Sequence, residues 1–264
     1  MKSLAPLLLL LTFVAACQPS QAPMTEFQST MPALESRADS LAFRALEASG
    51  GEQAFGSLPY LEFYFGSESS SGVRTGRRHL WDRMSGDYRL EYNRGRDTTI
   101  VVLFNTQSRA GTAFRNGVEA DDSAMLVERA YGAFINDTYW LLMPTKMLDP
   151  GVFRELVPDS STTELEVVKL TFEEVGLTPG DSYYIYLDRQ TGMVKRWHYV
   201  LQSGREGRWD WADYVEMEGP YGPVRLSGRK VGQRSALLTD EIAVPKAVPE
   251  DAFTSPSARL PLEV

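Results

Sequence analysis

Cysteine and histidine are both scarce in this chain of 264 residues, which contains one cysteine and two histidines. A single cysteine cannot form a disulfide within the chain. His79 and His198 are far apart, and neither lies in the HxH or HExxH spacing of zinc sites. The sequence also lacks a GxSxG element, a P-loop and a glycine-rich dinucleotide loop. We therefore expect no metal, no cofactor and no enzymatic activity, and we interpret both histidines as residues on a sheet surface.

Excess positive charge and long hydrophobic runs are also missing. The formal net charge of −8 weighs against nucleic acid as a partner, because phosphate binding needs a surplus of Lys and Arg. The apolar run from Leu4 to Ala16 is shorter than the roughly 20 residues that a membrane-spanning helix needs. Because Lys2 precedes it, this run is typical of the apolar region of a signal peptide. No second run is long enough to cross a membrane.

The apolar run ends in Val14-Ala15-Ala16-Cys17, which resembles the lipobox of bacterial lipoproteins. The resemblance implies that residues 1–16 are removed as a signal peptide and that lipid on Cys17, such as palmitate, holds the protein on a membrane. Gln18, in place of an Asp, implies the outer membrane and a body that faces the periplasm. The alternative is an ordinary secretory signal with an incidental cysteine. Residues 17–32 contain few large apolar residues, so we interpret them as a flexible tether.

Apolar spacing predicts a helix followed by a run of antiparallel strands. In residues 33–49, Leu34, Leu41 and Ala45 share one helix face, and Gly50-Gly51 is typical of a helix end. The pattern then alternates with period two, and turns that contain glycine separate the segments, as in an antiparallel meander. The first predicted strands are 61–65, 77–83, 88–92, 98–104 and 111–115.

A second helical segment interrupts the strands. Apolar and aromatic residues from Ala124 to Phe134 step by three and four, which predicts a helix over 122–142. We expect Met143-Pro144 to end it. Strands then resume, and their turns again contain glycine. The second predicted set is 165–173, 182–188, 193–202, 208–217 and 224–230. The segment 248–253 is expected to dock against the body.

Polar pairs near these elements have simple structural interpretations. Asp121-Asp122 precedes the second helix, where acidic groups are favourable, and Glu173-Glu174 is expected to be solvated at a strand end. We interpret Asn136 and Asp137 as capping residues rather than as the polar rim of a cavity. Asp149-Pro150-Gly151 is interpreted as a turn, with a functional rim as the alternative.

The order of helix, strands, helical insert and strands leads to a family resemblance. Together with the lipobox, the hairpin Leu187–Val194 and the segments Asn136–Pro144 and Asp149–Gly151 resemble the LolA/LolB-like superfamily, including a group of bacterial lipoproteins within it. The resemblance covers roughly residues 33–253. It implies a mainly β, α+β fold in one domain over residues 33–264. That fold is a curved, open antiparallel half-barrel with an N-terminal helix and a helical insert packed in its mouth.

The same resemblance implies an apolar cavity between the sheet and the helices, in which LolA-like members carry lipoprotein acyl chains. Aromatic residues in this chain suit such a lining. Alternation puts Trp197 and Tyr199 on one face of a strand, and Trp209 and Trp211 on one face of its neighbour. Packing within a core is the competing interpretation. The candidate lining residues are Trp197, Tyr199, Trp209, Trp211, Tyr131, Phe134 and Trp140.

Three functions are compatible with these observations. The first is a membrane-anchored envelope protein that binds a lipid or a lipoprotein acyl chain. The second is an envelope interaction protein whose barrel is filled by its own side chains. The third is a hydrolase, for which the sequence shows no catalytic centre. An apolar cavity between the insert and the sheet separates the first from the second.

Overall fold

The computed structural model describes residues 31–173, 175 and 178–262. The predicted signal peptide, Cys17 and nearly all of the predicted tether lie outside the described residues. The helices are α1 (Arg37–Ala48), α2 (Gly51–Gly56), α3 (Ser123–Lys146) and the short 3-10 helix η1 (Pro158–Ser160). The strands are β1 (Tyr60–Ser69), β2 (Arg74–Asp82), β3 (Asp87–Asn93), β4 (Thr99–Asn105), β5 (Gly111–Arg115), β6 (Val118–Glu119), β7 (Val152–Leu156), β8 (Leu165–Phe172), β9 (Ser182–Asp188), β10 (Val194–Val200), β11 (Glu206–Gly219), β12 (Gly222–Val231) and β13 (Ser235–Leu238).

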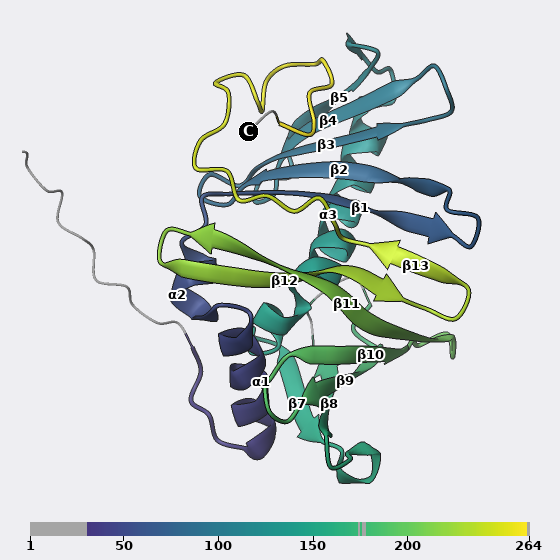
Figure 1. Ribbon diagram of the computed structural model, residues 1–264. Helices are drawn as coiled ribbons and strands as arrows, with labels where there is room; N and C mark the ends of the chain where they lie inside the picture. Colours follow the sequence, from purple (N-terminus) through teal and green to yellow (C-terminus); the bar gives the residue numbers. More distant parts are fainter. Residues whose placement is uncertain (1–30, 174, 176–177, 263–264) are drawn as a thin grey trace, which may run out of the picture.

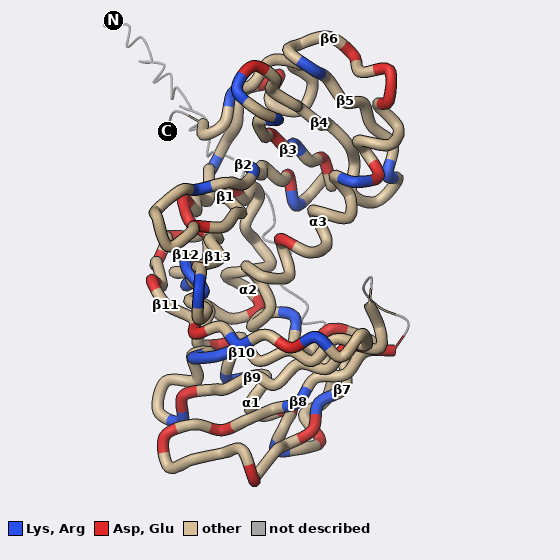
Figure 2. Tube along the Cα trace, turned by 90° about the vertical axis from the view of Figure 1, so that its right-hand side faces the viewer, with Lys and Arg blue, Asp and Glu red and all other residues tan. Residues whose placement is uncertain are grey.

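All of these strands belong to one antiparallel sheet. Its 13 strands run in the order β6-β5-β4-β3-β2-β1-β13-β12-β11-β10-β9-β8-β7. The sheet is open, because β6 and β7 form its two edges and do not pair with each other. The helix α3 connects these edges, and the sheet curves around it (Figure 1 and Figure 2). The predicted mainly β, open antiparallel fold with a helical insert is confirmed.

The N-terminal helix begins later than the predicted residue 33, because a local hydrogen-bond pair sets its start. The Ser36 hydroxyl accepts the Asp39 backbone N–H, and the Asp39 carboxylate accepts the Ser36 N–H. This capping box satisfies donors that the first helical turn leaves free. Gly50, with φ of 122°, then turns the chain into α2, a helix that the sequence pattern did not predict. A Cβ at Gly50 would lie 2.6 Å from the Pro223 carbonyl oxygen, so the corner packs closely on β12.

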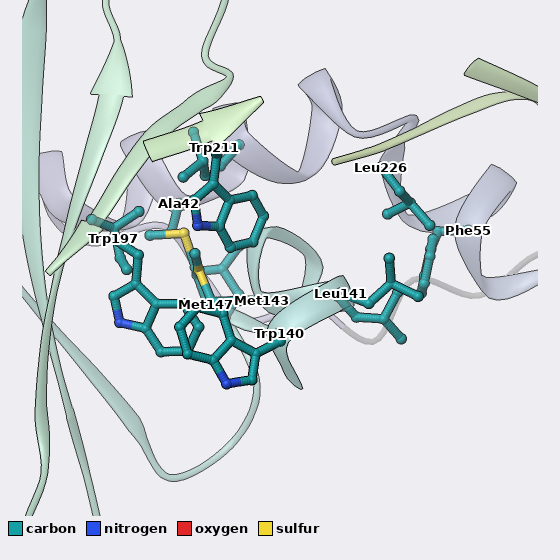
Figure 3. Packing of buried hydrophobic residues seen from close by; sticks show 14 of the residues in the cluster. Ala42, Phe55, Trp140, Leu141, Met143, Met147, Trp197, Trp211 and Leu226 are labelled. Atoms are coloured by element: carbon teal, nitrogen blue, oxygen red, sulfur yellow. The ribbon is translucent and has the colours of Figure 1, made fainter. Parts of the chain in front are cut away.

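The helix α3 continues through Pro144 to Lys146, so the prediction that Met143-Pro144 ends it is wrong. Proline removes one helical hydrogen bond. However, Met143 and Met147 are fully buried on either side of it, and burial of such side chains contributes about 1.5–3 kcal/mol each. Figure 3 shows both methionines packed among Ala42, Trp140 and Trp197. Core packing of these methionines therefore outweighs the tendency of Pro144 to end the helix.

Two hydrophobic cores lie along α3. The larger core joins its C-terminal half to α1, α2, β1 and the strands from β7 to β13. The smaller core joins its N-terminal half to β3, β4 and β5. Sequence patterning missed β6, β7 and β13, each of at most five residues, because such short segments carry little periodic signal. No helix in the described ranges is long and apolar enough to cross a membrane.

The C-terminal segment docks against the body, as predicted for residues 248–253. Ala252 is fully buried. The Arg89 guanidinium donates to the carbonyls of Ala252 and Ser255, each at 2.9 Å. The Glu91 carboxylate accepts backbone N–H groups from the segment further along the chain. Buried charges on β3 therefore bind the main chain of this segment.

Candidate functional site

A cavity of about 590 Å³ lies between the second half of α3 and the β7–β10 end of the sheet. Its volume is within the range of small-molecule sites, which is about 300–1,000 Å³. The helix contributes one wall, and β8, β9 and β10 form the opposite wall. The helix residues are Phe134, Ile135, Asn136, Thr138, Tyr139 and Trp140, and the strand residues are Phe172, Tyr183, Trp197 and Tyr199.

Aromatic rings that line the cavity hold its two walls in contact. The ring centroids of Trp140 on α3 and Trp197 on β10 are 4.1 Å apart. Tyr139 lies 5.7 Å from Trp197, and Tyr183 lies 4.9 Å from it, both edge-on. Such pairs stabilise the packing by about 0.5–1.5 kcal/mol each beyond their area burial. The walls are therefore preorganised, while most of the surface that faces the cavity remains apolar.

The structure brings four of the seven candidate residues to the cavity surface. Trp197, Tyr199, Phe134 and Trp140 are lining residues. The other three do not line it. Trp209 packs edge-on against Trp140 at 5.8 Å. Trp211 is 5% exposed in the larger core, with the Lys230 Nζ atom 4.4 Å from its ring centroid. Tyr131 lies in the smaller core, under the Arg109 guanidinium at 4.2 Å.

The register of β10 and β11 explains this split. Trp197 is directly opposite Trp209, and Tyr199 is opposite Gly207, so the indoles do share a face as alternation predicts. However, α3 crosses that face, where Trp140 packs against both Trp197 and Trp209, and only Trp140 and Trp197 line the cavity. Position along a strand gives the face, whereas the path of the helix decides which part of the face is open.

Several lining residues were not among the candidates. Tyr139 adjoins Trp140 in the sequence, and Tyr183 is directly opposite Tyr199 on β9. Tyr183 could have been predicted from the sequence, because period-two alternation along β9 and β10 places it on the same face as Tyr199. Trp81 on β2 also lines the cavity, and it packs edge-on at 5.2 Å against Phe134 in the middle of α3. No local pattern connects β2 to this site, because the contact depends on the sheet curvature.

The cavity rim is polar. Lys146 at the end of α3 forms an ion pair of 2.9 Å with Asp149. The predicted turn Asp149-Pro150-Gly151 is confirmed by the positive φ of 79° at Gly151, and its first two residues also line the rim. Asp181 is buried and accepts the Gln202 backbone N–H. Arg205 is exposed at the rim, and no carboxylate of the described chain lies within ion-pair distance of it.

Next to the cavity, α3 is joined to β2 through a buried ion pair. Asp137 is fully buried, and its carboxylate accepts N–H groups of Arg77 at 2.5 and 2.7 Å. The His79 Nε2 atom lies 3.1 Å from Asp137, and its Nδ1 atom is 2.7 Å from the Tyr88 hydroxyl. These residues lie at the boundary between the two cores. Since Asn136 lines the cavity, the ion pair positions this part of the wall.

Two interpretations from the sequence are therefore wrong. Asn136 and Asp137 are both in the middle of α3, where Asn136 lines the cavity and Asp137 binds β2, so neither caps a helix end. His79 is fully buried rather than on a sheet surface. His198 does lie on the outer side, where it contacts Glu206 at 3.0 Å. Residue periodicity does not reveal such a cross-element pair, because the partners are about 60 residues apart in the sequence.

Burial and the neighbouring groups set the charge states of this cluster. Burial lowers the pKa of His79, which favours the neutral ring. Burial alone would raise the pKa of Asp137, but the contacts with His79 and Arg77 outweigh it and lower the pKa. Burial raises the pKa of Tyr88. These shifts favour an ionised carboxylate and guanidinium beside a neutral imidazole. The part of the chain that the structure describes holds no group of three or more His, Cys, Asp or Glu that could bind a metal.

Comparison with solved structures shows a similarity of fold. No family model and no curated protein matches the sequence. The structure is similar to a LolA superfamily protein from Nitrosomonas europaea, with 10% identity, a TM-score of 0.44, and coverage of 83% of this chain and 97% of that one. It is also similar to a DUF1329 family protein from Desulfovibrio piger, with 9% identity, a TM-score of 0.47, and coverage of 82% and 96%. At these values the likeness concerns the fold and carries no information on a ligand.

Proposed function

We propose that this protein is a lipid-anchored envelope protein that binds an apolar ligand, a lipid or a lipoprotein acyl chain, in the cavity between α3 and β8–β10. The observation that carries the proposal is an aromatic-lined cavity of about 590 Å³. Its position between the helical insert and the sheet supports ligand binding over a barrel filled by its own side chains. Each methylene buried there contributes about 0.8 kcal/mol, so a chain of several methylenes supplies a substantial binding free energy.

Membrane attachment is the second part of the proposal. The lipobox-like Val14–Cys17 supports a lipid on Cys17, and the stretch that follows supports a tether to the body. A lipid anchor at one membrane is compatible with a protein that receives or holds acyl chains there. Outer-membrane placement rests on Gln18 and is part of this proposal.

Lipid capture by the full-length protein tests the binding function. We expect native mass spectrometry of the full-length protein, purified from bacterial membranes and transferred to an amphipol, to show bound lipid beyond the covalent anchor. We also expect the protein to take up a fluorescent fatty acid. The absence of both signals from well-folded protein would refute ligand binding.

A matched pair of variants locates the site. Leu201, which is partly buried, lines the cavity mouth, so Leu201→Arg brings a charge into the acyl-chain path. We expect at least a tenfold loss of fatty-acid affinity, because burying a charge in an apolar site is unfavourable. Val231 is 42% exposed and is not a lining residue, so Val231→Arg is the control and should bind normally. Equal binding by both variants would mean that the ligand lies elsewhere.

A further inference from the structure

Hydrogen-bond donors in the cavity wall lack acceptors within the protein. The Tyr139 hydroxyl and the indole N–H groups of Trp81 and Trp197 are buried, and they have no hydrogen-bond partner among the described residues. All three residues line the cavity. Buried donors without acceptors cost free energy, and native proteins contain few of them. The indole N–H groups of Trp209 and Trp211, which do not line the cavity, also lack partners. The position of the other three donors around one cavity, rather than the lack of partners alone, therefore points to a ligand that supplies acceptors.

The carboxylates at the same site are already engaged. Asp149 accepts the Lys146 ammonium at 2.9 Å, and Asp181 accepts the backbone N–H of Gln202 at 2.9 Å. Exposed Arg205 is one more donor at the rim. The site thus has unsatisfied donors beside carboxylates that already bind donors. This imbalance favours a ligand with oxygen acceptors over one with ammonium or amide donors.

Two of the donors are carried by rings that pack against each other. Tyr139 on α3 and Trp197 on β10 have ring centroids 5.7 Å apart and come from opposite walls. Burial raises the pKa of Tyr139 well above its usual range, and the nearby Tyr183 and Asp149 raise it further. The phenol therefore remains protonated and can donate. Both rings line the cavity but their donor atoms are buried, so the inference includes a small side-chain turn that brings each donor to the cavity surface.

Building on the proposed function, we infer that the ligand is an acyl chain that carries carbonyl oxygens, as a fatty-acid carboxylate or an ester, and that Tyr139 and Trp197 donate hydrogen bonds to these oxygens. The hydrocarbon part packs on the surrounding aromatic rings. The oxygens satisfy donors that the protein leaves without partners. A plain hydrocarbon fills the same space but leaves these donors unsatisfied.

Three probes separate these contributions: decanoate, methyl decanoate and dodecane. The full-length protein in an amphipol, labelled with ¹⁵N at its five tryptophans, is titrated with each probe and followed by indole NMR signals. Trp197→Phe assigns the critical signal. We expect both oxygen-bearing probes to bind more tightly than dodecane and to move the Trp197 indole proton downfield. Tighter binding of decanoate than of its methyl ester would indicate a free fatty acid, and the reverse order an esterified lipid.

Tyr139→Phe tests the second donor. It removes a hydroxyl that has no partner in the protein, so we expect the variant to be at least as stable as the wild type. Loss of one hydrogen bond should weaken methyl decanoate binding roughly 2- to 10-fold, with dodecane binding unchanged. The control is Tyr131→Phe, because Tyr131 lies in the smaller core outside the cavity. A purely structural role for Tyr139 would lower stability or weaken all probes equally.

The possible outcomes distinguish this inference from the proposed function. Equal affinities for dodecane and methyl decanoate, with an unmoved Trp197 signal, would overturn the inference and leave apolar binding in place. Failure of all three probes to bind well-folded protein would overturn the proposed function and the inference with it. Selective weakening in Tyr139→Phe together with the indole shift would support both.

Discussion

Replacement of Asp137 by Asn should remove the charge that joins α3 to β2 while preserving side-chain volume. In the folded protein the Asp137 carboxylate accepts two N–H groups of Arg77, and the Asn136 side chain donates to it at 2.8 Å. An amide offers one acceptor oxygen in place of two and presents an NH₂ group to these donors. Arg77 would then remain in a largely apolar setting without its counter-charge.

The expected loss of stability follows from the burial of the pair. Removing one partner of a fully buried ion pair costs about 3–5 kcal/mol. The Asp137 side chain has no exposed surface, but the Arg77 side chain is 33% exposed, so water can solvate part of the remaining guanidinium. We therefore expect Asp137→Asn to lower the free energy of unfolding by about 2–4 kcal/mol, somewhat less than the range for fully buried pairs.

The assay is equilibrium unfolding in urea, followed by circular dichroism and tryptophan fluorescence. The control is Asp210→Asn, which breaks an ion pair of similar length between Asp210 and Arg196. The side chains of Asp210 and Arg196 are 55% and 43% exposed. Exposed pairs contribute about 0–1 kcal/mol. A loss for Asp137→Asn no larger than for the control, at unchanged denaturant dependence, would refute the argument that this buried pair stabilises the fold.

Two further predictions concern pH and membrane attachment. Burial lowers the pKa of His79 from its ordinary value of 6.5, so below that pH the unfolded chain binds a proton that the folded protein excludes. The stability associated with His79 should therefore be present above pH 6.5 and be lost as the pH falls through the folded-state pKa. Urea unfolding above and below pH 6.5 should show a weaker pH dependence for His79→Gln than for the wild type or His198→Gln, and equal slopes would contradict this. Cys17→Ser should abolish labelling by an alkyne fatty acid and release the exported protein from the membrane fraction, whereas Ser20→Ala should change neither. A membrane-bound Cys17→Ser protein would show that another feature attaches it.

Much of the local structure could be predicted from the sequence. Period-two alternation and glycine turns located most of the strands, since each strand buries one face in the same sheet. The helix-periodic residues around Tyr131 and Phe134 located α3, although its C-terminal end was placed several residues early. The short strands β6, β7 and β13 were not predicted, because segments of at most five residues carry little periodic signal.

The candidate site, too, could be predicted only in part from the sequence. Alternation correctly placed Trp197 and Trp209 on a common face, because the direction of a side chain on a strand follows from local backbone geometry. Only the tertiary structure decided that Trp197 lines the cavity while Trp209 packs against Trp140 and does not line it. It also decided that Asp137 and His79 meet in the interior. These relations depend on where α3 crosses the curved sheet, a consequence of packing between segments far apart in the chain, which local periodicity does not encode.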